Sequence, residues 1–314
     1  MKDVIIIGAG TAGLTAAVYA LRAGKSVLVL EQGTYGGQII NTPKVENYPG
    51  IEQISGYEFA SGLFRQAEKL GMEYRSEKVT DVRLENDGAD AVKEISSAEM
   101  KTSGKIVETA EGAYHAKTVI LATGAKNRLL GIEKETEYTG RGISYCATCD
   151  GMFFRGKKVA VVGGGNTALE DAAFLSNYCE KVYVIHRRDT FRGEEKQVKE
   201  LQAKENVEFL LHKTVQALEG GLTLQAVVLN DRESGEASRL EVEGLFVAIG
   251  RIPDTEVFAK LIELDENGYV LAGEDCRTNV DGIFAAGDCR KKTVRQLTTA
   301  AADGAVAALS AAQI

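Results

Sequence analysis

The feature that most limits how this 314-residue chain can fold is a glycine pattern that occurs twice between an apolar strand and a helix. The first copy is G-x-G-x-x-G over residues 8–13, between the β-branched run 4–7 and a helical pattern over 14–22. A further apolar run over 26–30 ends at Glu31. Glycines at this spacing permit a tight turn and let a pyrophosphate approach the helix N-terminus, and the acid meets a ribose hydroxyl. This segment therefore predicts a dinucleotide-binding βαβ unit.

The second copy is followed by a different charge. Residues 157–162 predict a strand, G-x-G-x-x-A follows over 163–168, and a helix over 169–177 leads to a strand over 181–185. Where the first unit has an acid, this one has His186, Arg187 and Arg188, with Arg192 just beyond. A cationic cluster at this point binds a phosphate on the ribose through charge-assisted hydrogen bonds. We therefore expect this site to prefer NADPH over NADH; the alternative is a solvated basic surface.

Between the two patterns lies a C-x-x-C motif, Cys146 and Cys149, followed at once by Asp150. Such a motif is half of a zinc site, a redox pair or a coincidence. A zinc site needs two more Cys or His ligands, and the other cysteines and the three histidines are dispersed singly along the chain. The short spacing favours a disulfide and lowers the pKa of one thiol. A redox pair is the favoured interpretation, and we expect no metal site.

Composition restricts the possible partners and the location. The net charge is −8 without a basic block, which argues against nucleic acid or an anionic membrane as the main partner. The apolar stretch over 4–21 has the hydropathy of a signal peptide or membrane helix, but glycines interrupt it. A buried strand and helix explain this stretch better. Five cysteines are too few for a disulfide scaffold and indicate a reducing, cytoplasmic location.

Two matching strands indicate how the domains are connected. Residues 118–122 and 244–248 are apolar runs that continue into Gly124 and Gly250 as Ala-x-Gly. We interpret them as two crossings between domains, with these glycines as candidate hinges. The expected fold class is α/β with two Rossmann-like nucleotide-binding domains, the second inserted in the first: residues 1–124 with 249–314, and residues 125–248. Short strands and turns over 72–114 suggest a small antiparallel sheet.

Together these motifs resemble the low-molecular-weight thioredoxin reductases of prokaryotic type, over essentially the whole chain. The resemblance rests on residues 146–150, 163–168 and 186–192, and on Gly287-Asp288 with Arg295-Gln296. On spacing alone, Asp288 at the end of a strand is explained equally well as a group that meets a ribityl hydroxyl and as a helix cap. The resemblance implies a flavoprotein with FAD in the first domain, NADPH in the second, a homodimer, and thioredoxin as electron acceptor.

The fingerprints and the resemblance together identify candidate site residues. The catalytic candidates are Cys146, Cys149 and Asp150. The residues expected to bind FAD are Gly8, Gly10, Thr11, Ala12, Gly13, Glu31, Gln32, Gly37, Gln38, Asn47, Gly287, Asp288, Arg295, Gln296 and Leu297. The residues expected to bind NADP are Gly163, Gly165, Asn166, Thr167, Ala168, His186, Arg187, Arg188 and Arg192.

The activity implied by the resemblance is electron transfer from NADPH through FAD and the Cys146–Cys149 disulfide to oxidised thioredoxin. The family assigns the flavin-facing thiol to Cys149 and the attack on thioredoxin to Cys146. Asp150 is either the acid–base group or a turn residue. Because the dithiol and the NADPH site share one domain and the flavin lies in the other, the inserted domain should rotate about its two crossings.

Two alternatives stay open. A sister flavoprotein fed by ferredoxin, or a dithiol oxidase that uses oxygen, should lack a working NADPH site, whereas this chain keeps Gly163, Gly165 and three arginines. A non-enzymatic flavin-binding redox sensor is the alternative from a different class, and it would need no C-x-x-C beside an aspartate.

Overall fold

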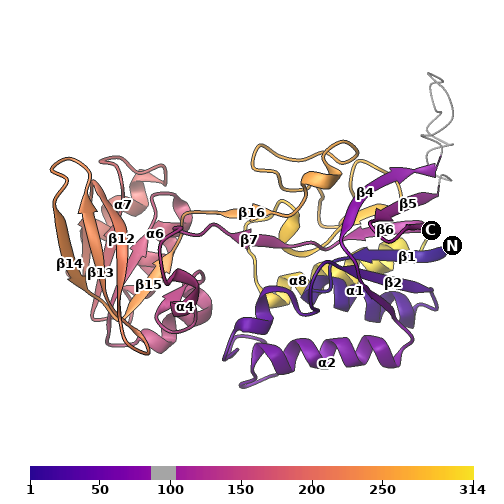
Figure 1. Cartoon of the computed structure of the whole chain (residues 1–314), viewed down its shortest axis with the longest axis horizontal. Coiled ribbons are helices and arrows are strands. Elements are labelled where there is room, and N and C mark those ends of the chain that lie inside the picture. The colour runs from indigo at the N-terminus through magenta and orange to yellow at the C-terminus, as the bar shows by residue number, and fades with distance from the viewer. Residues whose placement is uncertain (86–103) are drawn as a thin grey trace. The chain divides into compact units, whose positions relative to one another are not determined.

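The computed structural model describes residues 1–85 and 104–314, and the chain divides into two compact units (Figure 1). Unit 1 comprises Met1–Lys126 and Ile252–Ile314, and unit 2 comprises Asn127–Arg251. The chain passes between the units at 126/127 and 251/252, where the sequence suggested 124/125 and 248/249.

Unit 1 is built on a seven-stranded sheet with the strand order β3-β2-β1-β6-β5-β4, and β17 also pairs with β6. β1 runs parallel to β2 and β6, with Ile6 opposite Val29 and Ile120. The elements of unit 1 are β1 (Lys2–Ile7), α1 (Thr11–Arg22), β2 (Val27–Glu31), η1 (Gly37–Asn41), α2 (Gly56–Lys69), β3 (Glu73–Ser76), β4 (Val79–Leu84), β5 (Lys105–Thr109), β6 (Ala113–Leu121), η4 (Glu256–Phe258), β17 (Ile283–Ala285), η5 (Gly287–Cys289) and α8 (Leu297–Ala311).

The alternation of side chains along β1 gives this sheet two buried faces. Val4 and Ile6 belong to the core that α1 and α8 cover, and Figure 1 shows these helices on one side of the sheet. Ile5 and Ile7 belong to the core on the other face, together with Phe258. Burial on both faces explains why β1 is a continuous apolar run, as is typical of parallel strands.

The separate antiparallel sheet predicted over 72–114 is wrong in part. β3 pairs in parallel with β2, and β4 and β5 are antiparallel but join the main sheet. The reason is the length of β6, which is nine residues long. His115, in its first half, pairs with β5, whereas Val119, in its second half, pairs with β1. Residues 86–103 of this prediction lie outside the described residues.

Unit 2 repeats the plan with a five-stranded parallel sheet in the order β11-β10-β9-β15-β8. Val159 and Val161 of β9 face the core of α5 and α6, and Ala160 and Val162 face a three-stranded sheet, β12-β13-β14. The elements are α4 (Glu135–Tyr138), β8 (Ile143–Ser144), α5 (Ala147–Asp150), η3 (Gly151–Phe154), β9 (Lys158–Val162), α6 (Asn166–Leu175), β10 (Lys181–Ile185), α7 (Glu195–Gln202), β11 (Val207–Leu210), β12 (Lys213–Gly220), β13 (Leu224–Asp231), β14 (Ala237–Glu241) and β15 (Gly244–Val247).

The two crossings between the units form a short ribbon. β7 (Ala125–Asn127) and β16 (Arg251–Pro253) pair as a two-stranded sheet. The flanking Gly124 and Gly250 have φ angles of 70° and 112°, a region in which glycine meets no steric cost. Of the helices in residues 1–85 and 104–314, none has the length and apolarity needed to cross a membrane.

Candidate active site

The two cysteines of the C-x-x-C motif are joined in a disulfide at the start of α5 in unit 2. Cys146 is the N-cap residue of this helix, and the Cα atoms of Cys146 and Cys149 are 5.3 Å apart. Ala147 is 1 % exposed and belongs to the core under the sheet, whereas Cys149 lies at the surface. The buried alanine fixes the helix on unit 2, and Cys149 is exposed beside it.

Asp150 ends α5 and is held by a residue that the sequence analysis did not select. The Ser144 hydroxyl donates to Asp150 Oδ2 at 2.6 Å and accepts the backbone N–H of Cys146 at 3.1 Å. Burial raises the pKa of Asp150, and the Ser144 hydrogen bond offsets part of that rise. A carboxyl group with a raised pKa beside a dithiol is suited to hold and return a proton. The signal for Ser144 in the sequence was a hydroxyl two residues before the first cysteine.

The first glycine loop leaves the N-terminus of α1 open. α1 begins after Gly10, and no side chain of the described residues caps it. A Cβ on Gly13 would lie 1.8 Å from the Gly8 carbonyl oxygen, so this glycine lets the helix pack on the strand. At Gly10 the nearest atom to such a Cβ would be the Cα of Gly37, at 3.9 Å. Two backbones without side chains therefore form a cradle that fits a pyrophosphate, and Thr11 and Ala12 supply the first turn of the helix.

Glu31 closes this cradle at the end of β2. Its carboxylate accepts the backbone N–H groups of Ala9 at 2.8 Å and Gly33 at 3.0 Å. A carboxylate has about four acceptor positions, so Glu31 retains capacity for a ribose hydroxyl. The neighbouring Gln32 donates instead to Asp254, at 3.2 Å, which ties the loop after β2 to the segment after β16.

Two predicted amides connect loops of unit 1. Asn47 Nδ2 donates to Gln296 Oε1 at 3.3 Å, and Gln296 and Thr299 cap α8 through reciprocal hydrogen bonds. The Gln38 amide donates to the Ala125 carbonyl oxygen. The segment 37–47 is therefore fixed to the N-terminus of α8 and to β7.

The Gly287–Asp288 motif reaches the first glycine loop from the other end of the chain. A Cβ on Gly287 would lie 2.8 Å from the Cβ of Ala12, so glycine allows this turn to approach α1. Arg295 Nε donates to the backbone carbonyl of Asp288 at 3.4 Å, and α8 begins at Leu297. Predicted residues from both ends of unit 1 thus gather at the C-terminal ends of β1, β2 and β17, the usual ligand position in such sheets.

A buried ion cluster, missed in the sequence, holds this turn. Asp303 of α8 is 7 % exposed and accepts the Gly287 backbone N–H at 2.9 Å. It also accepts hydrogen bonds from Arg290, at 2.8 and 2.9 Å, and from Lys292, at 2.7 Å. Burial alone would raise the pKa of Asp303, but the hydrogen bonds from Arg290 and Lys292 outweigh it, and the pKa is lowered.

The second glycine loop, in unit 2, is also open. α6 begins at Asn166 after Gly165, again without a side-chain cap from the described residues. None of the described atoms lies within 4 Å of a Cβ placed on Gly165. Ala168 takes the place of a third glycine. A Cβ added to Gly163 would lie 2.6 Å from the Cβ of Ala168. Thr167 is exposed in the first turn. This loop also fits a pyrophosphate at a helix N-terminus.

The loop after β10 folds back over this glycine loop. The backbone N–H of Arg192 donates to the Gly164 carbonyl oxygen at 2.7 Å. The His186 ring is 8 % exposed, stacks on Phe191 with 4.8 Å between centroids, and places Nε2 3.0 Å from the Thr190 carbonyl oxygen. Burial lowers the pKa of His186. His186 therefore shapes the loop from inside, unlike the arginines around it.

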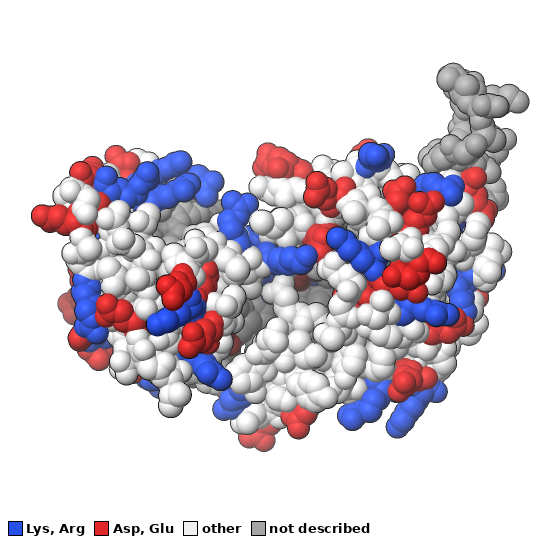
Figure 2. Space-filling view, in the orientation of Figure 1, with Lys and Arg blue, Asp and Glu red and all other residues white. Residues whose placement is uncertain are grey.

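Arg187, Arg188 and Arg192 are exposed on this loop, and Figure 2 shows Lys and Arg side chains gathered near α7 in unit 2. Arg232, in the turn after β13, places Nη1 3.4 Å from the Arg187 carbonyl oxygen. Sequence reasoning missed Arg232 because it is 45 residues from Arg187 and belongs to no motif. The cluster is the region of unit 2 best suited to a ribose phosphate.

In residues 1–85 and 104–314, no three His, Cys, Asp or Glu side chains are grouped as metal ligands.

Nearly the whole chain is similar to known redox enzymes. Residues 2–304 match the family described as pyridine nucleotide-disulphide oxidoreductase. The thioredoxin reductase of Bacillus subtilis (strain 168) is 42 % identical over 309 residues, which are 98 % of this chain and 93 % of that protein.

Two solved structures extend the similarity to the fold. The thioredoxin reductase of Streptococcus pyogenes MGAS5005 is 39 % identical, with a TM-score of 0.89 over 99 % of this chain and 97 % of that one. The Lactococcus lactis thioredoxin reductase in its FR conformation is 38 % identical, with a TM-score of 0.65 over 100 % of this chain and 98 % of that one.

Proposed function

Because the chain belongs to the pyridine nucleotide-disulphide oxidoreductase family, and within it to the thioredoxin reductases, we propose that it reduces a thioredoxin with electrons from NADPH. The observation that carries this proposal is the Cys146–Cys149 disulfide, with Asp150 beside it, in the unit that also holds the arginine-flanked glycine loop. The enzyme uses a flavin and a nicotinamide cofactor, and we assign FAD to unit 1 and NADPH to unit 2.

The assignment of FAD to unit 1 is supported by the chemistry of the residues there. The cradle of Gly10 and Gly37 leaves room for a pyrophosphate, and Glu31 offers a carboxylate to the adenosine ribose. Asp288 and Arg295 lie at the turn where Gly287 approaches Ala12 of α1, and we expect them to bind the flavin half. When bound, the flavin accepts a hydride from the nicotinamide and supplies two electrons to the disulfide.

The dithiol chemistry rests on three residues of unit 2. Reduction breaks the Cys146–Cys149 bond, places two electrons on the sulfurs and takes up protons. We assign Cys149 to the exchange with the flavin, Cys146 to the attack on thioredoxin, and Asp150 to holding the proton between these steps. Attack by the Cys146 thiolate on a thioredoxin disulfide forms a mixed disulfide, and Cys149 then displaces the reduced thioredoxin.

A reducing compartment fits the remaining cysteines. Cys179, Cys276 and Cys289 are free and buried, and burial raises the pKa of each, to about 11, 12 and 11. Thiols of this kind are poor nucleophiles. We propose that the protein acts in the cytoplasm, where thioredoxin is available and free thiols persist.

The experiment that tests this function separates flavin reduction from dithiol transfer. Cys146→Ser and Cys149→Ser should each abolish thioredoxin reduction, yet NADPH should still bleach the flavin, because hydride transfer does not need the disulfide. Anaerobic absorbance of the flavin and a thioredoxin-coupled assay measure the two steps. Thioredoxin turnover in either variant would contradict the electron path. A flavin that ferredoxin reduces and NADPH does not would favour the ferredoxin-dependent alternative.

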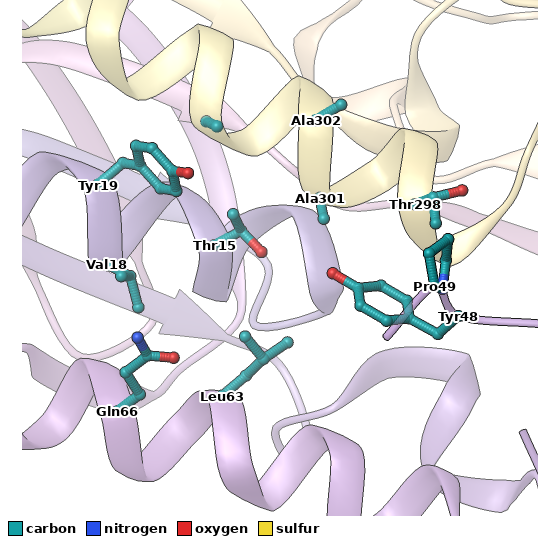
Figure 3. A pocket seen from close by; sticks show the side chains of 11 residues that line it. Thr15, Val18, Tyr19, Tyr48, Pro49, Leu63, Gln66, Thr298, Ala301 and Ala302 are labelled. Atoms are coloured by element: carbon teal, nitrogen blue, oxygen red, sulfur yellow. The ribbon is translucent and has the colours of Figure 1, made fainter. Parts of the chain in front are cut away.

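We also propose that the enzyme is a homodimer that pairs through unit 1. A cavity of about 420 Å³ opens between α1, α2 and α8 (Figure 3). Tyr19 and Leu63 line it opposite Ala302 and Ala305 of α8. Leu309 continues the same stripe of α8 four residues on and is 49 % exposed. A second copy of this chain would cover this apolar surface.

Light scattering after size-exclusion chromatography tests the dimer. Leu309→Glu places a charge on the stripe and should convert the holoprotein from two chains to one at micromolar concentration. The control is Leu222→Glu, which alters a residue that is 87 % exposed on a hairpin of unit 2. A dimer that survives Leu309→Glu, or a monomeric unaltered enzyme, would rule out pairing through this surface.

A further inference from the structure

The residue just before the redox pair is anchored to a buried carboxylate. The Tyr145 hydroxyl donates to Glu135 Oε1 at 3.0 Å, and Tyr145 directly precedes Cys146 in the chain. Glu135 is 2 % exposed. Its carboxylate also accepts the backbone N–H groups of Leu130 and Gly131, each at 2.8 Å. One buried side chain therefore ties the backbone that enters the first cysteine to a segment ahead of α4.

The chain between β8 and α5 is held from both faces of the sheet in unit 2. The ring of Tyr145 packs, with Ile143, into the core that the three-stranded sheet covers, whereas Ala147 belongs to the core of α5 and α6. Between them, the Ser144 hydroxyl accepts the backbone N–H of Cys146 at 3.1 Å. Cys146 thus lies between two anchored neighbours, and the anchor at Tyr145 depends on the carboxylate below it.

Backbone strain occurs at the residue that precedes this carboxylate. Lys134, the N-cap residue of α4, has a φ angle of 65°, a region that residues with a Cβ rarely adopt. Such a conformation persists only where its surroundings determine it. The three hydrogen bonds to the Glu135 carboxylate, and the bond from the Thr139 hydroxyl to the Glu135 carbonyl oxygen at 3.0 Å, are those surroundings. The local cost is therefore offset by the contacts that Glu135 makes.

We propose that Glu135 and Tyr145 are positioning residues for the redox pair: they hold the backbone at Cys146 while the disulfide is open, and so favour its closure. In the oxidised protein the sulfur–sulfur bond itself restrains Cys146. In the dithiol that restraint is gone, and the anchored Tyr145 keeps the Cys146 sulfur near Cys149. A dithiol with less freedom loses less conformational entropy when the bond forms. The inference rests on the redox role of the pair proposed above.

The test is the thiol–disulfide equilibrium of the flavin-loaded protein with glutathione, without nicotinamide and without oxygen. Two glutathione thiols reduce the protein disulfide and become one glutathione disulfide, so two electrons and two protons pass to the cysteine sulfurs. Acid stops the exchange, alkylation marks the reduced cysteines, and intact mass gives the reduced fraction. Flavin absorbance is recorded at each ratio, so that electrons held on the flavin are counted.

Tyr145→Phe removes the hydroxyl and keeps the ring. It should raise the equilibrium constant for reduction roughly fivefold, the effect expected when about one backbone residue gains freedom in the dithiol. Tyr114→Phe is the matched control, because the Tyr114 hydroxyl also donates to a glutamate, Glu77, at 2.9 Å, but in unit 1. The control should agree with the unaltered protein within about twofold. An unchanged constant for Tyr145→Phe, or an equal rise for Tyr114→Phe, would overturn the proposal.

The dependence on pH separates positioning from an effect of charge. Burial and the hydrogen bond to Glu135 raise the pKa of Tyr145 to about 12, so the hydroxyl keeps its proton at pH 6 and at pH 8. The ratio between the constants of Tyr145→Phe and the unaltered protein should therefore be the same at both pH values. A rise at pH 8 alone would overturn the proposal, because it would show that the hydroxyl acts on a thiolate.

Glu135→Gln tests the other half of the anchor. Because Glu135 acts on Cys146 through Tyr145, adding Tyr145→Phe to Glu135→Gln should change the constant by less than about twofold, as for two members of one hydrogen-bond network. A further fivefold rise in the double variant would show that the two residues act separately, and would overturn the proposal.

Hydrogen exchange of the unaltered protein keeps the proposal testable if Glu135→Gln does not fold. The backbone N–H groups of Leu130 and Gly131 should stay protected after glutathione has reduced the redox pair, since the carboxylate that accepts them stays in place. Loss of this protection in the dithiol form would overturn the proposal. None of these measurements uses NADPH or thioredoxin, so failure of the proposed electron donor or acceptor leaves the result interpretable.

Discussion

Asp303 gathers two cations and a backbone N–H in a place nearly closed to water. Asp303→Asn would leave Arg290 and Lys292 without their counter-charge. We expect the free energy of unfolding of the flavin-loaded protein to fall by about 3 kcal/mol or more, since a broken buried ion pair leaves uncompensated charge. Urea unfolding followed by circular dichroism at pH 7 measures this. A loss below about 0.5 kcal/mol, typical of a surface change, would show that the cluster does not stabilise the fold.

The same residue predicts a pH dependence. The hydrogen bonds from Arg290 and Lys292 hold the pKa of Asp303 below its ordinary value despite burial, so the unfolded chain binds a proton at a higher pH than the folded chain. Its stabilising contribution is therefore complete above about pH 5 and is lost as the pH falls through the folded pKa. The difference in unfolding free energy between the unaltered protein and Asp303→Asn should shrink below about pH 4. A difference that grows on acidification would contradict this sign.

Cofactor choice depends on the exposed arginines of the loop after β10. Neutral replacements of Arg187 and Arg188 should weaken the binding of NADPH far more than the binding of NADH. The expected difference is on the order of 3 kcal/mol for two lost charge-assisted hydrogen bonds. Equilibrium binding of both nucleotides to the oxidised enzyme measures this. Arg239→Gln is the control, because Arg239 pairs with Glu219 on the three-stranded sheet instead. Equal losses for both nucleotides would place the ribose phosphate elsewhere.

The local sequence pattern predicts the role of some of these residues and cannot predict the role of others. Glu31 and Arg187 stand at fixed offsets from a glycine loop, and geometry of the βαβ unit alone assigns them a role. Asp303 and Arg232 act on partners that only the folded chain brings near.

At the scale of elements, the close approach of α1 and α8 determines what α8 tolerates. A Cβ on Gly304 would lie 2.2 Å from the Ala12 carbonyl oxygen, so Gly304→Ala should force the helices apart. Overpacking of this kind costs about 1–3 kcal/mol. Gly62→Ala in α2 is the control, since a Cβ there meets no described atom within 4 Å; it should stabilise by up to about 1 kcal/mol. Thermal unfolding of both variants measures these changes in stability. An unchanged melting temperature for Gly304→Ala would contradict the prediction.

Strands with a single hydrophobic pattern were predictable from the sequence. A strand whose two halves have different patterns and different partners was not. β1 and β9 are apolar on both faces and precede a glycine loop, which identifies a central parallel strand. β6 carries an alternating half and a continuous half within nine residues, so its sequence suggests two strands in two sheets. The register that joins them depends on β5, which directly precedes β6, and on β1, which lies far away in the chain.

At the scale of the whole molecule, the distribution of the redox sites over the two units predicts that unit 2 moves. Unit 2 carries the dithiol and the glycine loop assigned to NADPH, whereas unit 1 carries the loop assigned to FAD. The nicotinamide and the disulfide must each reach the flavin, so we expect unit 2 to rotate relative to unit 1.

The crossings of this chain suit a rotation of unit 2. Gly124 and Gly250 have positive φ angles, and a Cβ on either would meet no described atom within 4 Å. Hinges are a few residues at the ends of elements that absorb changes of φ and ψ. The paired β7 and β16 lie directly beside both glycines, so we expect the two crossings to move as one ribbon.

A disulfide engineered between the units, in whichever arrangement a crystal captures, should stop one half-reaction and spare the other. If the locked state holds Cys149 at the flavin, flavin reduction by NADPH should fall by orders of magnitude while exchange between dithiol and flavin survives. If it holds the nicotinamide there, the reverse should follow. The remaining rate reports how often the lock opens, because a competent state with population f supports about f of the rate. Rapid mixing at the flavin band separates the half-reactions, and reducing the lock should restore both. A locked enzyme that performs both at the unaltered rate would exclude the rotation.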